Sequence, residues 1–105
     1  MILAVVRLKV LTVKRKELQQ TLQSLAAQMK TETGCLDSNL YRLVEDENNF
    51  ALIGTWENRK ALDDHLQSNR FTVLMGARGL LSRSPEIMIH TVSQSSELRA
   101  GHLTK

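Results

Sequence analysis

The strongest constraint on the fold is the order in which two kinds of hydrophobic periodicity follow one another along the chain. Residues 2–11 are apolar except for Arg7 and Lys9, and Val6, Leu8 and Val10 share one side of the alternation, which is typical of a strand with a buried face. Residues 14–29 instead repeat apolar side chains every three or four positions, which predicts an amphipathic helix. The helix must therefore cover one face of a sheet that contains the strand.

The rest of the chain continues this pattern with four further elements. In order, these are strands at 36–44 and 50–57, a helix after the capping residue Asn58 with a further helical piece at 71–81, and a strand at 86–93. A short polar turn separates the first two of these strands, so they should form an antiparallel hairpin. The order strand, helix, strand, strand, helix, strand predicts an α+β, ferredoxin-like βαββαβ fold, an antiparallel sheet with its helices on one face.

The second face of such a sheet carries apolar side chains that need a cover. Candidates for this uncovered side are Val5, Leu11, Tyr41, Leu43, Ala51 and Ile53. Left bare, they would form an exposed apolar patch of the kind that marks an interface. We therefore expect a homodimer in which two sheets pack face to face.

Length and composition limit the chain to one globular domain. The 105 residues have room for a single core, which we place in residues 1–93, with a polar tail at 94–105. No apolar run approaches the roughly 18 residues of a membrane span, and the N-terminus lacks the cationic lead and cleavage site of a signal peptide. The single cysteine, Cys35, cannot form an internal disulfide. We expect a cytoplasmic protein that does not act at a membrane.

The segment around the only tryptophan resembles a known family. Trp56-Glu57-Asn58 is followed by Ala61-Leu62, by His65-Leu66 and by Phe71, while Gly34-Cys35 leads into the second predicted strand. This combination, over roughly residues 2–93, resembles the antibiotic biosynthesis monooxygenase domain of the dimeric α+β barrel group. The resemblance implies a dimeric α+β barrel, and for part of the family it implies oxygenation of quinols or aromatics with neither metal nor flavin.

Two features of the chain depart from patterns in that group. The haem-degrading members of that group carry a triad: an asparagine on the first strand, and a tryptophan and a histidine on the helical segment after the third strand. Residues 2–11 contain no asparagine and the tryptophan comes earlier, so haem degradation is not expected. Many relatives also carry a glutamate two residues before the tryptophan, where this chain has Gly54. We expect Gly54 to remove a carboxylate from the pocket and to leave extra space there.

The resemblance makes His65 the candidate catalytic base. In the absence of a cofactor, dioxygen reacts with a substrate that can donate an electron to it, typically a phenolate. The protein must therefore bind an aromatic compound, deprotonate it and exclude water. The ordinary pKa of histidine, about 6.5, suits that role. Candidate substrate-binding residues are Trp56, Phe50 and Leu52 as pocket walls, with either Tyr41 or Arg42 as a polar handle, because neighbours on a strand point to opposite faces.

Other functions have weaker support in the sequence. A metal site needs about three convergent ligands, and Asp63, Asp64 and His65 are spread by about 100° per residue around a helix, so no metal or other cofactor is expected. An RNA-binding sheet would need exposed aromatics on its central strands, and residues 2–11 contain none. One alternative stays open: a non-enzymatic small-molecule-binding or interaction module on the same dimeric scaffold, with His65 and Trp56 as core residues.

Overall fold

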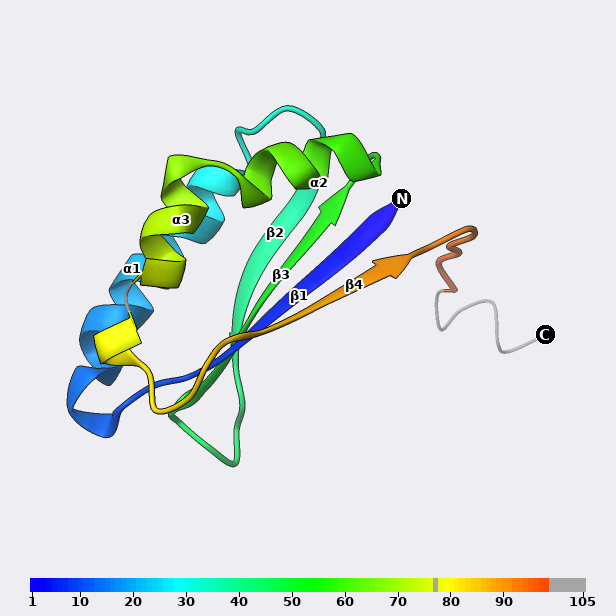
Figure 1. Cartoon of the computed structure of the whole chain (residues 1–105). Helices are drawn as coiled ribbons and strands as arrows, with labels where there is room; N and C mark the ends of the chain where they lie inside the picture. The colour runs from blue at the N-terminus through cyan, green and yellow to red at the C-terminus, as the bar shows by residue number, and fades with distance from the viewer. Residues whose placement is uncertain (77, 99–105) are drawn as a thin grey trace.

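The computed structural model describes residues 1–76 and 78–98. Within them, the strands form one antiparallel sheet in the order β2-β3-β1-β4, with β1 at Ile2–Lys9, β2 at Cys35–Arg42, β3 at Asn49–Trp56 and β4 at Glu86–Thr91. The α-helices are α1 (Arg15–Met29), α2 (Arg59–Leu66) and α3 (Asn69–Gly76), with short 3₁₀ helices η1 (Thr12–Lys14) and η2 (Arg78–Leu80) before and after them. All the helices lie on one side of the sheet (Figure 1). The α+β, ferredoxin-like fold is thus confirmed.

The alternation in β1 builds the centre of the core. Ile2, Ala4, Val6 and Leu8 are buried on the helix side, and each faces a residue of β3 in an unbroken antiparallel register. β1 also pairs with β4 on its other edge. A one-residue slip would move this whole apolar set to the opposite face, so burial of one face fixes the register.

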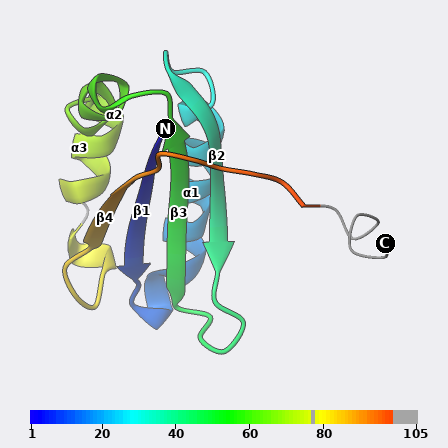
Figure 2. The same ribbon diagram turned by 90° about the vertical axis from the view of Figure 1, so that its right-hand side faces the viewer.

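The helices divide the covered face of the sheet between them. α1 lies behind β2 and β3, whereas α2 and α3 lie toward the β4 edge (Figure 2). The buried face of α1 consists of the positions predicted from its periodicity: Leu18, Leu22, Leu25, Ala26 and Met29. Within the described residues, no helix is both long and apolar enough to cross a membrane.

Several element boundaries differ from those predicted. β1 ends at Lys9 because the chain then turns into η1, and Val10 makes only an isolated bridge to Leu81. The helical piece expected at 71–81 is divided into α3 and η2, and residue 77 lies outside the described residues. β4 ends at Thr91. Residues 99–105 of the predicted tail also lie outside the described part, and the domain boundary at 93 stays a prediction.

The face of the sheet opposite the helices carries all but one of the apolar residues predicted for it. Val5 faces Ile53 on one neighbouring strand and Met88 on the other. Together with Tyr41, Leu43 and Ala51, Val5 and Ile53 line a shallow hollow of about 280 Å³. Leu11 is not part of this surface, because it follows the end of β1. We call the surface formed by Val5, Tyr41, Leu43, Ala51, Ile53 and Met88 the open face.

Candidate functional site

His65 is buried in an aromatic setting at one end of the sheet. Its side chain is 3% exposed, its ring stacks on Trp56 with centroids 4.9 Å apart and planes inclined by 29°, and Phe71 meets it edge-on at 5.3 Å. This geometry follows from a tight corner in the chain. β3 ends at Trp56, and the Asn58 side chain accepts a hydrogen bond from the Ala61 amide at 2.9 Å, which starts α2 at once.

A carboxylate from the opposite side of the site reaches the histidine. The Oε2 and Oε1 atoms of Glu32 lie 3.0 and 3.2 Å from Nδ1 of His65. Because a carboxylate only accepts hydrogen bonds, Nδ1 carries the hydrogen and donates it. Among the described residues, His65 has no hydrogen bond at Nε2. In the neutral ring Nε2 therefore holds the free lone pair, as a general base requires.

Gly34 allows Glu32 to approach. Gly34 has a φ of +83°, in the left-handed region that glycine adopts without cost. A Cβ at this position would lie 2.5 Å from Cβ of Ala61 on α2, closer than two carbon atoms that are not bonded to each other can approach. The Gly34 carbonyl also accepts a hydrogen bond from the Glu57 amide at 2.8 Å. The turn between α1 and β2 is thus held against the start of α2, with Glu32 beside His65.

The environment of His65 favours the neutral ring. Burial lowers the pKa of His65 below its ordinary value, and the positive charge of Arg70 adds to this lowering. The Glu32 carboxylate opposes both effects, through its charge and through the hydrogen bond. Desolvation is the largest of these effects. Near neutral pH, the ring is therefore available to accept a proton.

The space beside the histidine is small and closed. It measures about 10 Å³, enough for about one water molecule. Its walls are almost entirely apolar and include Leu52, Trp56, Leu62 and Phe71. One polar atom is left over, because Nε1 of Trp56 is buried without a hydrogen-bond partner among the described residues. A buried donor of this kind is costly unless a hydrogen-bond acceptor occupies the space beside it.

The residues predicted as substrate contacts divide into two groups. Trp56 and Leu52 line the cavity with His65. Phe50 is buried on the same face of β3, but six residues along a strand correspond to about 20 Å, so it does not line this cavity. Arg42 pairs with Phe50 at that far end and is exposed, and Tyr41 lies on the open face. The structure therefore does not bring Phe50, Tyr41 and Arg42 to His65.

Gly54 does not leave extra space, and that expectation was wrong. A Cβ on Gly54 would lie 3.0 Å from Nε1 of Trp56 and 3.2 Å from Cε of Met29. The indole and the methionine have therefore filled the volume that a side chain would take. Gly54 pairs with Ser38 on the neighbouring strand β2, and the Ser38 hydroxyl lies 3.6 Å from the Met29 sulfur.

Glu32 was missed by the sequence analysis. The family pattern places an acid two residues before Trp56, on the same strand, where this chain has Gly54. Glu32 comes from a turn 33 positions away from His65 in the sequence. The available signal was its place two residues before Gly34, since a left-handed glycine marks where the chain turns back toward the sheet.

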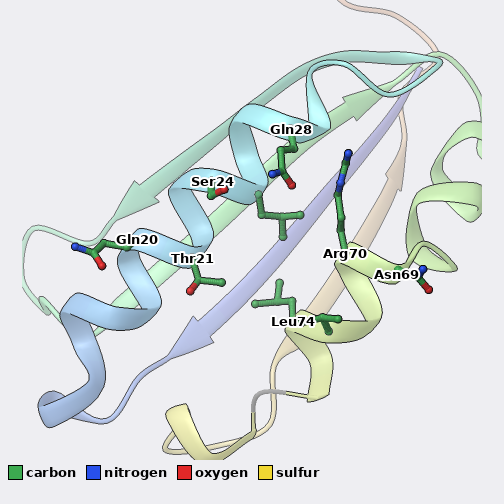
Figure 3. Close-up of a pocket in the computed structure, with 9 residues that line it drawn as sticks. Gln20, Thr21, Ser24, Gln28, Asn69, Arg70 and Leu74 are labelled. Carbon is green, nitrogen blue, oxygen red and sulfur yellow. The ribbon is translucent and has the colours of Figure 1, made fainter.

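An open groove lies on the same side of the sheet, between α1 and α3 (Figure 3). Its volume is about 580 Å³, and α3 contributes Arg70 to it. The only cysteine is not activated: burial raises the pKa of Cys35, so the thiol stays protonated. In the part of the chain that is described, no three His, Cys, Asp or Glu side chains come together as a metal site.

Comparisons with known proteins agree with this architecture. Residues 1–76 match the family model described as antibiotic biosynthesis monooxygenase. An uncharacterized protein of Synechocystis sp. is 28% identical over 92 residues, which are 87% of this chain; the chain spans about 63% of the length of that curated relative.

Two solved structures are similar over almost the whole chain. A Caulobacter crescentus protein, provisionally named an antibiotic biosynthesis monooxygenase, is 27% identical with a TM-score of 0.79, over 89% of this chain and 90% of that one. A Deinococcus radiodurans protein with the same provisional name is 20% identical with a TM-score of 0.88, over 95% of this chain and 100% of that one, a likeness that shows the fold.

Proposed function

This chain belongs to the antibiotic biosynthesis monooxygenase family, and from that premise we propose that it is a cofactor-independent monooxygenase acting on a quinol or phenolic compound. Family membership supports a monooxygenase-like role in general. The observation that carries the finer proposal is the buried His65, which stacks on Trp56 and is held at Nδ1 by Glu32. In this proposal His65 is the base, and Trp56 and Leu52 are walls of the substrate site.

The proposed reaction begins with a proton transfer. Nε2 of neutral His65 takes the proton of a phenolic hydroxyl, and Glu32 stabilises the resulting imidazolium through the hydrogen bond at Nδ1. The phenolate is electron-rich enough to donate an electron to dioxygen. One oxygen atom then enters the ring and the other leaves as water, with every electron supplied by the organic substrate. The apolar walls exclude bulk water from the intermediate.

Substrate entry requires the site to open. A cavity of about 10 Å³ does not admit an aromatic ring. The side chains around His65 must therefore move apart when a substrate binds, which is an induced fit. The unpaired Nε1 of Trp56 would then gain an acceptor from the bound molecule.

Oxygen uptake with a panel of substituted hydroquinones tests the proposal. We expect consumption of dioxygen by the wild-type chain and a loss of about 10²- to 10⁴-fold in His65→Ala, the usual contribution of a general base. The exposed Gln67→Ala at the end of α2 is the matched control and should keep full activity. Circular dichroism must show that both variants fold. Absence of turnover across the panel, or equal turnover in wild type and His65→Ala, would remove the catalytic role.

A second candidate is a non-enzymatic binding module on the same scaffold. The closed, largely apolar space around His65 favours it. The hydrogen bond at Nδ1 does not, because it goes to a carboxylate rather than to the backbone as in a simple core histidine. Binding of phenolic compounds without oxygen uptake would support this alternative.

We also propose that the chain is a homodimer joined through the open face. Proteins of this family are typically dimeric. The open face presents Tyr41 and Met88 at 51% and 47% exposure, and a second sheet packed on it would bury them. The helix side, where His65 lies, stays free in such a dimer (Figure 2).

A further inference from the structure

The groove between α1 and α3 has the size and lining of a small-molecule site. Its volume of about 580 Å³ falls in the range of known ligand sites, roughly 300 to 1,000 Å³. Leu25 and Leu74 are buried residues that form its floor. The polar groups around them include Ser24 and Gln28 on α1 and Asn69 on α3 (Figure 3). An apolar floor with polar groups around it suits a flat organic molecule.

The lining of the groove carries a single charge, which is positive. Arg70 is its only charged lining residue, so no carboxylate faces the guanidinium there. Two other arginines in the described part of the chain do have acidic partners: Arg59 lies 2.9 Å from Asp63, and Arg15 lies 3.1 Å from Glu47. Arg70 makes neither a hydrogen bond nor an ion pair with any described residue. Its side chain extends from α3 to about the level of Gln28 on α1 (Figure 3).

We propose that this groove binds an aromatic carboxylate, with the ring on Leu25 and Leu74 and the carboxylate on the Arg70 guanidinium. Arginine presents paired N–H donors that match the two oxygens of a carboxylate. The Gln28 amide and the Ser24 hydroxyl lie on the α1 side and can bond the remaining lone pairs. Arg70 is a binding residue here and takes no part in proton transfer. That the bound ring is a quinol rests on the proposed function; the preference for a carboxylate does not.

The position of the groove links it to the buried histidine. Arg70 is near enough to His65 for its charge to act on the imidazole. The next residue, Phe71, is the aromatic that meets His65 edge-on. One turn of α3 therefore has Arg70 on the groove and Phe71 on the inner cavity. A ligand held at Arg70 lies beside the wall that must move for a ring to reach His65.

The test compares two ligands that differ only in the carboxylate: 2,5-dihydroxybenzoate and hydroquinone. Binding is followed by amide chemical shifts in ¹⁵N-labelled full chain, under anaerobic conditions. We expect shifts at residues 24–28 and 69–74, and about 3- to 10-fold tighter binding of the carboxylate at low salt, with the difference shrinking as salt rises. Arg70→Gln should abolish the difference, and Arg70→Lys should keep part of it.

Two further variants keep the test decisive. Arg83→Gln removes an equal charge from the loop before β4, outside the groove, and should change nothing. Ser24→Tyr fills the groove without changing charge and should weaken both ligands, whatever happens to the Arg70 variants. Equal binding of the two ligands, or a preference that survives in Arg70→Gln, would overturn the proposal.

Oxygen uptake separates this proposal from the catalytic one. If 2,5-dihydroxybenzoate binds at Arg70 but neither ligand is oxidised, the catalytic proposal fails and the proposal of a binding site in the groove stands. If hydroquinone is oxidised but the two ligands bind equally tightly and Arg70→Gln leaves both affinities unchanged, the groove proposal fails while catalysis stands.

Discussion

Substitution of Gly34 by alanine tests the packing that brings Glu32 to His65. Two separate costs arise at this position. A residue with a Cβ pays about 1–2 kcal/mol to adopt the left-handed conformation, which Gly34 holds at a φ of +83°. The new Cβ would also lie 2.5 Å from Cβ of Ala61, against an optimal separation of about 3.5–4.0 Å.

The second cost follows from the required movement. Relieving the contact demands a shift of about 1 Å between the turn and α2, and overpacking of this kind typically costs about 1–3 kcal/mol. The free energy of unfolding should therefore fall by about 2–5 kcal/mol, a large share of the roughly 5–15 kcal/mol of a domain of this size. With a urea slope of about 1–3 kcal/mol per molar, the midpoint should fall by about 1–3 M.

Urea unfolding at fixed protein concentration measures this loss, since a dimer would make stability depend on concentration. Gly79→Ala is the matched control, because its Cβ would meet nothing within 4 Å, and it should change stability by less than about 1 kcal/mol. In the double variant with Ala61→Gly the steric cost should disappear, giving a coupling of about 1–3 kcal/mol. A loss below about 1 kcal/mol in Gly34→Ala, or no coupling to Ala61→Gly, would refute the reasoning.

Four more predictions concern the site and the sheet. Glu32→Gln should lower the pKa of His65 further, as read from an NMR titration of the ring, because it removes the charge that opposes burial; an unchanged pKa would contradict the pairing. Because the pKa of His65 is lower in the folded chain than in the unfolded chain, the unfolded chain binds more protons, and the free energy of unfolding should decline as pH falls below about 6.5. His65→Gln should flatten that decline; an equal slope would assign it to other groups. Gly54→Ala should cost about 1–3 kcal/mol of stability in urea unfolding by overpacking, and a neutral result would mean that its neighbours are loosely packed. Ile53→Asp should yield a monomer in light scattering at micromolar concentration, whereas Val13→Asp, at a position 88% exposed outside the sheet, should not; a dimer in both would place the interface elsewhere.

Local patterns were sufficient to predict most of the fold. The alternation in residues 2–8 has one physical solution, because only one face of the central strand meets the helices. Asn58 caps α2 as its residue type indicates, and Gly34 takes the left-handed conformation that glycine commonly adopts after a helix. These signals act over a few residues, so a single sequence contains them.

The candidate site depends on relations that a local pattern does not carry. Even spacing placed Phe50 and Trp56 on the same face of β3, but it says nothing about distance along the strand, and the two residues end up on different parts of the core. Glu32 reaches His65 only because a turn and a helix meet through Gly34 and Ala61. Such contacts are set by how whole elements pack.

The stacking of Trp56 on His65 also makes the chain a natural fluorescence sensor. Trp56 is the only tryptophan, so all indole emission comes from a ring whose centroid lies 4.9 Å from the imidazole. A protonated imidazole quenches an excited indole by accepting an electron, and a neutral one quenches it far less. The emission intensity therefore reports the charge on the proposed base without any label. A ring that slides between the two would change the same signal, so proton binding and ligand entry can both be followed in the native sequence.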